Sequence, residues 1–312
     1  MLEIKELHKQ FGSLHAVKGI SFTVEKGEVL GFLGPNGAGK STTMRMITGF
    51  LPPTSGTAII NGHDVVADPI AAKKETGYLP ENAPVYSDMT VRAFLSFVAE
   101  IRGYSGAERL RRVDAAIESA HLEKVRNQTV STLSKGYKQR VCFAQAILHD
   151  PPILIMDEPT DGLDPNQKQV VRSMIREMAS RKVIVVSTHI LEEVEAICTR
   201  AIIISSGKLV ANGTPAELKT RCACHGAVEL VFDRASDAMA SDLRLLSSAS
   251  RVESRDNSFT LFPKDPGRLL ADVTELVRQR NWHPTGLRVI EGRLEDVFHD
   301  LTLGEETVRK AG

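Results

Sequence analysis

The sequence lacks the features that would place the chain within a membrane or on nucleic acid. No apolar run approaches the ~20 residues that span a bilayer. The N-terminal residues mix charged with apolar side chains and contain no hydrophobic signal segment. Basic and acidic residues balance at 39 each, so the basic excess that is typical of nucleic-acid binders is missing. From these absences we expect a cytoplasmic chain that binds no nucleic acid.

Cysteine is scarce, with four in 312 residues. Cys142 and Cys198 lie in predicted amphipathic helices, where a free cysteine behaves as a small buried hydrophobic residue. Cys222 and Cys224, followed by His225, suggest a metal site. Their spacing differs from that of zinc ligands, however, and no second ligand pair follows. We therefore expect no metal there.

Internal repeats and low-complexity tracts are also missing, so an ordinary globular organisation is expected. At roughly 100–200 residues per domain, a chain of this length suggests about two domains. We predict a main domain over residues 1–221. The remainder, 222–312, is predicted to be a small α+β accessory domain.

Short apolar runs predict the strands of the main domain. Residues 29–33, 153–156 and 183–186 are nearly continuous apolar stretches, the pattern of strands buried on both faces. Because helical segments alternate with them, we expect an α/β fold with a mostly parallel sheet. Residues 1–30 also predict strands, which we assign to an antiparallel β subdomain.

A helical insert interrupts this α/β pattern. Apolar residues recur at helical spacing over 91–101, after the candidate cap Thr90, and again over 110–120. We expect a helical subdomain at about residues 84–149.

The C-terminal segment changes in character. Two alternating stretches, 228–232 and 258–262, predict strands, and 269–278 and 294–301 predict helices. Two roles stay open for this segment. It is either a packing or dimer-stabilising appendage, which we favour, or a regulatory ligand sensor.

A phosphate-binding loop is the most specific motif of the sequence. The pattern Gly-x-x-x-x-Gly-Lys-Ser lies between the predicted strand 29–33 and a predicted helix, which is the context this motif requires. Its glycines let backbone N–H groups face phosphate oxygens, and the start of the helix adds its positive end. A dinucleotide-binding loop does not fit, because no Gly-x-Gly-x-x-Gly opens this helix. The candidate ATP-binding residues here are Gly34, Pro35, Asn36, Gly37, Ala38, Gly39, Lys40, Ser41 and Thr42.

Acidic residues and a histidine follow the next two predicted buried strands. Asp157 ends one strand and can hold Mg²⁺ directly or through water. Glu158 can orient or deprotonate the attacking water, and His189, after the next strand, is poised to reach the γ-phosphate. We expect Lys40 to contact the β- and γ-phosphates and Ser41 to ligate Mg²⁺. The catalytic candidates are therefore Lys40, Glu158 and His189.

Taken in order, these motifs resemble the nucleotide-binding subunits of ABC transporters over about residues 1–220. The segment 133–137 resembles the family signature, and 162–165, which includes Asp164, resembles the loop that reaches the other protomer. Phe11 sits where the family places an aromatic side chain that stacks on adenine. The resemblance implies a P-loop NTPase fold, ATP and Mg²⁺ as cofactors, and ATPase activity.

Two departures from the family pattern narrow the resemblance. The signature usually reads Leu-Ser-Gly-Gly-Gln, and here Lys135 and Tyr137 replace a glycine and the glutamine. Ser134 and Gly136, which the family uses to touch the γ-phosphate, remain. Glu81 stands where glutamine is usual, and its carboxylate can bind Mg²⁺ but cannot donate an N–H. Both variants resemble those of bacterial ABC-2-type exporter ATPases, including gliding-motility-like subunits.

The resemblance also implies partners. Two copies would close head to tail, so that Ser134 of one copy completes the ATP site of the other. Integral-membrane permease subunits would bind a groove near Glu81 and the helix at 90–101, on the cytoplasmic face of the inner (plasma) membrane. The alternative is a soluble ABC-type ATPase that acts on ribosomes or DNA. Such proteins usually carry two nucleotide modules or long coiled-coil insertions, whereas this sequence has one phosphate loop and no sustained heptads.

Overall fold

The computed structural model describes residues 1–82, 84–222 and 224–309. It divides into two compact units, which we call the N-terminal unit (Met1–Thr214) and the C-terminal unit (from Pro215). The division lies before the 221/222 boundary expected from the sequence, because helix α8 (Pro215–Lys219) packs against α11 (Leu294–Arg309). Within the described ranges, the helices are too short or too polar to cross a membrane.

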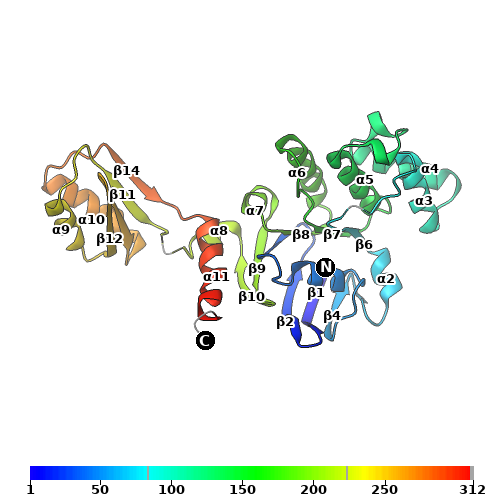
Figure 1. Ribbon diagram of the computed structural model, residues 1–312, viewed down its shortest axis with the longest axis horizontal. Coiled ribbons are helices and arrows are strands. Elements are labelled where there is room, and N and C mark those ends of the chain that lie inside the picture. The colour runs from blue at the N-terminus through cyan, green and yellow to red at the C-terminus, as the bar shows by residue number, and fades with distance from the viewer. Residues whose placement is uncertain (83, 223, 310–312) are drawn as a thin grey trace. The chain divides into compact units, whose positions relative to one another are not determined.

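A six-stranded sheet forms the centre of the N-terminal unit (Figure 1). Its strands are β3 (Val29–Leu33), β6 (Thr76–Leu79), β7 (Ile153–Asp157), β8 (Val183–Thr188), β9 (Arg200–Ser205) and β10 (Lys208–Gly213). They lie in the order β10-β9-β3-β8-β7-β6, and all run parallel except the edge strand β10. Every residue of β3, β7 and β8 is buried, as expected for apolar strands covered on both faces.

A four-stranded antiparallel sheet contributes to the core on one face of the central sheet. Its strands are β1 (Leu2–Phe11), β2 (Leu14–Val24), β4 (Ser55–Ile60) and β5 (His63–Asp64), in the order β2-β1-β4-β5. Ile153 and Ile155 of β7 share a core with Leu2 and Phe22 of this sheet and with Met44 of the helix that follows β3. The structure therefore confirms the predicted α/β fold.

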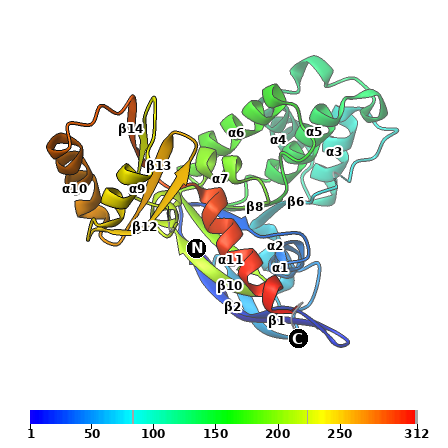
Figure 2. The ribbon, with the colours of Figure 1, turned by 60° about the vertical axis from the view of Figure 1, so that its left-hand side comes forward.

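Helices provide the core on the opposite face. The helical elements of this unit are α1 (Lys40–Ile47), α2 (Pro69–Lys74), α3 (Val91–Ile101), α4 (Gly106–Ser119), η1 (Glu123–Val125), η2 (Val130–Thr132), α5 (Lys135–Ile147), α6 (Pro165–Ala179) and α7 (Leu191–Ile197). Leu154 of β7 shares this second core with Phe94 of α3, Phe143 of α5 and Met174 of α6. Thr90 caps α3, since its hydroxyl accepts a hydrogen bond from the Ala93 N–H at 3.2 Å. In Figures 1 and 2, α3, α4 and α5 gather as one group beside β6.

The C-terminal unit has its own antiparallel sheet and core. Its remaining elements are β11 (Ala227–Val231), α9 (Asp237–Arg244), β12 (Ala249–Arg255), β13 (Ser258–Pro263), α10 (Pro266–Gln279) and β14 (Gly286–Ile290). The strand order is β12-β13-β11-β14, with α9 packed against β12 and α10 against β11. Phe232 and Phe259 anchor the core, and Trp282 meets the Phe232 ring edge-on at 6.0 Å.

Candidate nucleotide-binding site

The site is built where three neighbouring parallel strands end. Strand β3 pairs with β8, and β8 pairs with β7, so the segments that follow them meet at one edge of the sheet. The register places Leu33 opposite Thr188 and Asp157 opposite Ser187. This explains how residues more than a hundred positions apart in the chain come into contact. Ligands of open parallel sheets bind at such an edge.

Two glycines fix the path of the phosphate loop. A Cβ on Gly34 would lie 2.6 Å from the carbonyl oxygen of Ile204, which leaves no room for a side chain. Gly39 caps α1 with a φ of 108°, a left-handed conformation that L side chains rarely adopt. The loop therefore delivers the chain into the N-terminus of α1, whose first N–H groups are free to bind an anion. Between these glycines and in the first turn of α1 lie Pro35, Asn36, Gly37, Ala38 and Thr42.

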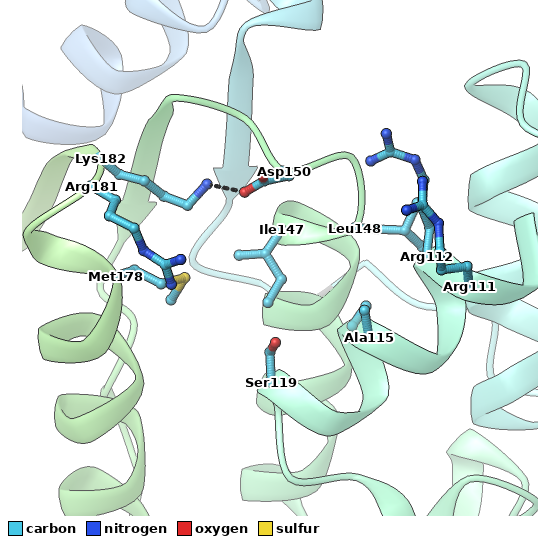
Figure 3. Close-up of a pocket in the computed structure, with 11 residues that line it drawn as sticks. Arg111, Arg112, Ala115, Ser119, Ile147, Leu148, Asp150, Met178, Arg181 and Lys182 are labelled. Carbon is cyan, nitrogen blue, oxygen red and sulfur yellow. Dashed lines mark hydrogen bonds and ion pairs between the residues drawn. The ribbon is translucent and has the colours of Figure 1, made fainter. Parts of the chain in front are cut away.

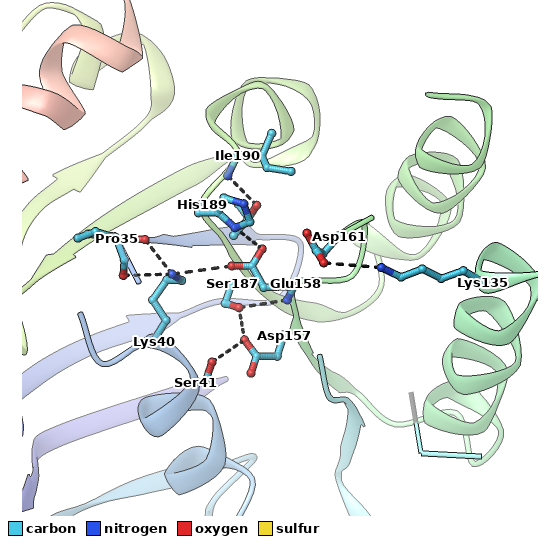
Figure 4. A network of polar contacts seen from close by, with 12 residues as sticks. Pro35, Lys40, Ser41, Lys135, Asp157, Glu158, Asp161, Ser187, His189 and Ile190 are labelled. Atoms are coloured by element: carbon cyan, nitrogen blue, oxygen red, sulfur yellow. Dashed lines mark hydrogen bonds and ion pairs between the residues drawn. The ribbon is translucent and has the colours of Figure 1, made fainter. Parts of the chain in front are cut away.

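Lys40 is the buried cation of the site and is only 6% exposed. Its Nζ donates to the carbonyl oxygens of Gly34 at 2.8 Å and Pro35 at 3.3 Å. It also lies 3.8 Å from a carboxylate oxygen of Glu158 (Figure 4). Burial lowers the pKa of Lys40, and the carboxylates of Glu158, Asp157 and Glu81 oppose that shift.

Asp157 ends β7 and joins two hydroxyl groups. Its Oδ1 accepts hydrogen bonds from Ser41 at 3.3 Å and from Ser187 of β8. Asp157 is 1% exposed, so the two hydroxyl donors are needed to stabilise its buried carboxylate. A carboxylate beside a hydroxyl is the hard oxygen chemistry that Mg²⁺ prefers, and the pair fits that ion.

Glu158 and His189 form a second polar contact of the site. Glu158 has a φ of 49°, and its N–H is held by the Ser187 carbonyl at 3.1 Å and the Ser187 hydroxyl at 3.2 Å. The Nδ1 of His189 lies 3.0 Å from Oε2 of Glu158. The Glu158 carboxylate is thus fixed between Lys40 and His189 (Figure 4).

The structure brings six of these residues into one network, which we call the phosphate cluster. Its members are Lys40, Ser41, Asp157, Glu158, Ser187 and His189. Ser187 is the member that the sequence analysis missed. A hydroxyl residue at the end of a strand is common, and its role becomes visible only through the pairing of β7 with β8.

Phe11 and Glu81 lie at other strand ends of the N-terminal unit. Phe11 closes β1 and is 46% exposed, with the Nζ of Lys9 5.1 Å from the centre of its ring. Glu81 follows β6 and is exposed, and its charge acts on Lys40. Their predicted roles in adenine and metal binding stay predictions.

The signature residues lie at the start of α5, and Asp164 lies at the start of the neighbouring helix α6. Ser134 caps α5, and its Oγ accepts from the N–H of Tyr137 at 3.4 Å. Gly136 packs against Gln167 of α6, because a Cβ on that glycine would lie 2.7 Å from the Gln167 side-chain oxygen. Asp164 caps α6 and accepts from the N–H of Gln167 at 3.0 Å. Ser134, Lys135 and Gly136, which are the cap and the first two residues of α5, are called the α5 tip below.

Several hollows lie elsewhere on the N-terminal unit. A pocket of about 350 Å³ is bordered by Arg181 and by Lys182, which pairs with Asp150 at 2.5 Å (Figure 3). A larger groove of about 920 Å³ runs along α3 and includes Phe97 and His149. Burial lowers the pKa of His149 to about 3, so its imidazole is neutral at physiological pH.

The cysteines take two different forms in the structure. Cys222 and Cys224, in the C-terminal unit, form a disulfide. Cys142 of α5 and Cys198, which directly follows α7, are free thiols, and burial raises the pKa of each to about 12. Such thiols are inert at neutral pH.

Comparison with known proteins agrees with this geometry. Residues 17–161 match a family model described as "ABC transporter". The chain is 34% identical to the Nod factor export ATP-binding protein I of Ralstonia nicotianae, over 97% of this chain and 94% of that protein. It is 32% identical to the linearmycin resistance ATP-binding protein of Bacillus subtilis, over 97% and 98%. An ABC transporter A family member of Dictyostelium discoideum is 38% identical over 67% of this chain, which spans only 24% of that longer protein.

Solved structures give the same result for the fold. One described as the ATP binding subunit of an ABC transporter has a TM-score of 0.65 and 32% identity, and covers 71% of this chain and 92% of that one. A dimeric bacterial ABC transporter cassette has a TM-score of 0.63 and 26% identity, and covers 69% and 98%. The matched shares correspond in size to the N-terminal unit.

Proposed function

The chain belongs to the ATP-binding subunits of ABC transporters, and we propose that its phosphate cluster binds and hydrolyses Mg²⁺-ATP. Proteins of this family are ATPases that power transport, and their ATPase domains bind ATP, generally with Mg²⁺. The observation that carries the proposal is the fixed Glu158 carboxylate between Lys40 and His189. This arrangement places a cation that can bind phosphate and a carboxylate that can accept a proton from water beside the N-terminus of α1.

Binding follows from the charges and donors of the cluster. Lys40 exchanges its contacts with the loop carbonyls for the β- and γ-phosphates, to which its charge is better matched. Ser41 and Asp157 would hold Mg²⁺, with Glu81 as a further candidate ligand. The ion neutralises charge on the triphosphate when bound. Phe11, exposed at the end of β1, offers its ring to the adenine base.

Hydrolysis uses the contact between Glu158 and His189. The carboxylate of Glu158 accepts a proton from the attacking water, and His189 holds that carboxylate and reaches toward the γ-phosphate. The backbone of Glu158 is locked by the two hydrogen bonds to Ser187, which keeps the side chain in place.

Two copies are needed to complete the site in this proposal. The phosphate cluster forms one network, whereas Ser134 and Gly136 lie outside that network, at the start of α5. The dimeric form of a similar cassette supports a pair of chains. In our proposal the pair is head to tail, so that the α5 tip of one chain faces the ATP of the other. The ATPase rate per chain, measured over a wide range of protein concentrations, should rise with concentration in dilute solution. A rate per chain that stays constant down to monomeric concentrations contradicts the paired site.

A permease is the proposed second partner, at the cytoplasmic face of the membrane. The groove along α3 combines apolar side chains, such as Phe97, with the neutral His149, and suits an apolar segment of that partner. Relatives matched over nearly their full length are named for Nod factor export and linearmycin resistance, which favours an exporter over an ATPase of ribosomes or DNA. Co-purification from membranes should yield an integral-membrane protein. Recovery of ribosomes or DNA in its place contradicts the proposal.

The C-terminal unit is proposed to be an appendage that stabilises packing or the dimer. Its sheet and helices enclose a core of their own, centred on Phe232 and Phe259. The alignment with the Nod factor export protein covers 97% of this chain and therefore extends through this unit. The simplest explanation is that both proteins inherited this unit from a common ancestor of similar length.

A further inference from the structure

Lys135 is a positive charge at the α5 tip, at a position where the family signature usually has glycine. It is the first residue of α5 and stands between Ser134, which caps the helix, and Gly136. We propose that Lys135 is a further catalytic residue, which leaves Asp161 of its own chain and binds the γ-phosphate of the ATP held by a second copy. The inference rests on the head-to-tail pair of the proposed function.

The structure shows where Lys135 lies in a single chain. Its Nζ is 3.8 Å from Oδ2 of Asp161, and the two side chains are 63% and 51% exposed. The lysine crosses over Gly162, because a Cβ on that glycine would lie 1.9 Å from Nζ. Figure 4 shows the side chain extended from α5 toward the loop that follows Glu158. The side chain of Lys135 therefore points toward the loop that follows Glu158 and does not run along α5.

The ion pair with Asp161 contributes too little free energy to explain why a lysine stands at this position. Exposed ion pairs contribute about 0–1 kcal/mol, and a pair at the long end of the distance range belongs at the low end. The loop is also tied to α5 without it, since the buried side-chain amide of Gln139 donates to the carbonyl of Pro159 at 3.1 Å. Removing Lys135 leaves this tether intact.

A γ-phosphate is a stronger partner for this lysine than Asp161. It carries more negative charge than a carboxylate, and an interface between two copies excludes water, so the same charges attract more strongly. The N-terminus of α5 adds its own positive end at the same place. The triphosphate would then be held by Lys40 from one copy and by Lys135 from the other. A glycine at this position could supply only its backbone.

The test measures nucleotide-driven dimerisation of the full chain by analytical ultracentrifugation. Wild type, Lys135→Met, Lys135→Arg and Asp161→Asn are compared with Mg²⁺ and either a non-hydrolysable ATP analogue or ADP. Lys138→Met is the matched control, because it removes the same charge from the same helix one turn later. Binding of the analogue to dilute monomer is measured alongside, to show that each variant keeps a working phosphate loop.

Lys135→Met should weaken the analogue-bound dimer at least about tenfold, because hydrogen bonds to charged groups contribute about 1.5–3 kcal/mol. With ADP, which has no γ-phosphate, the variant should match wild type. Lys135→Arg should retain most of the affinity, and Asp161→Asn and Lys138→Met should dimerise as wild type does. Monomer affinity for the analogue should be unchanged throughout.

Three results would overturn the inference in distinguishable ways. If Lys135→Met dimerises like wild type, the lysine has no role at the phosphate, although the proposed dimer stands. If Asp161→Asn loses as much affinity as Lys135→Met, the pair acts within one chain. If wild type binds the analogue but does not dimerise with it, the head-to-tail pair of the proposed function fails and this inference fails with it, whereas the proposed ATP binding stands.

Discussion

Lys40 and Lys135 are two cations of the same subunit in opposite environments. Lys40 is 6% exposed and is held by two carbonyl groups and the carboxylate of Glu158. The side chain of Lys135 is 63% exposed and has one ion pair at 3.8 Å. The first is fixed before any ligand arrives, whereas the second can leave its partner at little cost.

The difference extends to the residues around each lysine. In the phosphate cluster, Asp157 and Glu158 are buried, and their contacts come from the start of α1 and from the end of β8 with the residue that follows it. At the α5 tip, Ser134 is exposed and its hydroxyl only caps its own helix. The chain thus assembles one half of a catalytic site internally and presents the other half on its surface. The following experiments ask whether this division is real.

Glu158→Gln should give the largest effect, because it removes the proton acceptor from the assembled half. Turnover should fall about 100- to 10,000-fold, the usual contribution of a general base. ATP binding should persist, since glutamine keeps the shape of the side chain beside Lys40. The measurement is the ATPase rate together with the ATP dissociation constant, with Glu177→Gln, an exposed residue of α6, as the control. Full turnover in Glu158→Gln would show that another group takes the proton.

Lys40→Ala should weaken nucleotide binding rather than turnover alone. The dissociation constant for ATP should rise about 10- to 100-fold, since hydrogen bonds from a charged donor contribute about 1.5–3 kcal/mol. Isothermal titration calorimetry on dilute protein is the measurement. Lys182→Ala is the matched control, because Lys182 is also buried but bonds Asp150 and Pro151, away from the cluster. An unchanged ATP dissociation constant in Lys40→Ala would remove the phosphate loop from the proposal.

The assembled half was largely predictable from sequence. Lys40, Asp157 and His189 each follow a continuous apolar strand, and parallel strands bring their ends to one edge. Ser187 was not predictable, because its value depends on lying opposite Asp157 in the register. The pairing of Lys135 with Asp161 was missed for a similar reason, since it depends on how α5 lies against a loop of the same chain.

In the C-terminal unit, the alternation of apolar residues predicted some strands and missed others. β11 and β13 were found because they carry the buried residues of its core, such as Leu230 and Phe259. The strands at the two edges of that sheet, β12 and β14, are mostly exposed and left no alternating signal. Strands β6, β9 and β10 of the six-stranded sheet were also not predicted from the sequence, although β9 is nearly all buried.

Ser134→Ala should show whether the two halves of the site act separately, because it changes only the half that lies on the surface. The cap is long, at 3.4 Å, so the free energy of unfolding should fall by only about 0.5 kcal/mol. Turnover at high protein concentration should nevertheless fall about tenfold, since one hydrogen bond to a charged phosphate is lost. ATP affinity of the dilute monomer should not change. Ser131→Ala, an exposed serine just before α5, is the control, and a loss of monomer affinity in Ser134→Ala would mean that the halves are not separate.

Ser187→Ala should give the smallest catalytic effect and the clearest cost in stability. Its hydroxyl donates to Asp157 and accepts from the Glu158 N–H, and the residue is fully buried. Removing it leaves a buried carboxylate short of a donor, so urea denaturation should show a loss of about 1–3 kcal/mol. Turnover should fall only a few-fold, because the Ser187 carbonyl still holds the Glu158 backbone at 3.1 Å. Ser205→Ala makes the same change in a buried serine at the end of β9 and serves as the control.

Ser134→Ala and Ser187→Ala then form a pair, in which the exposed hydroxyl matters for the dimer and the buried one for the fold. Equal stability losses in the two variants would contradict that distinction.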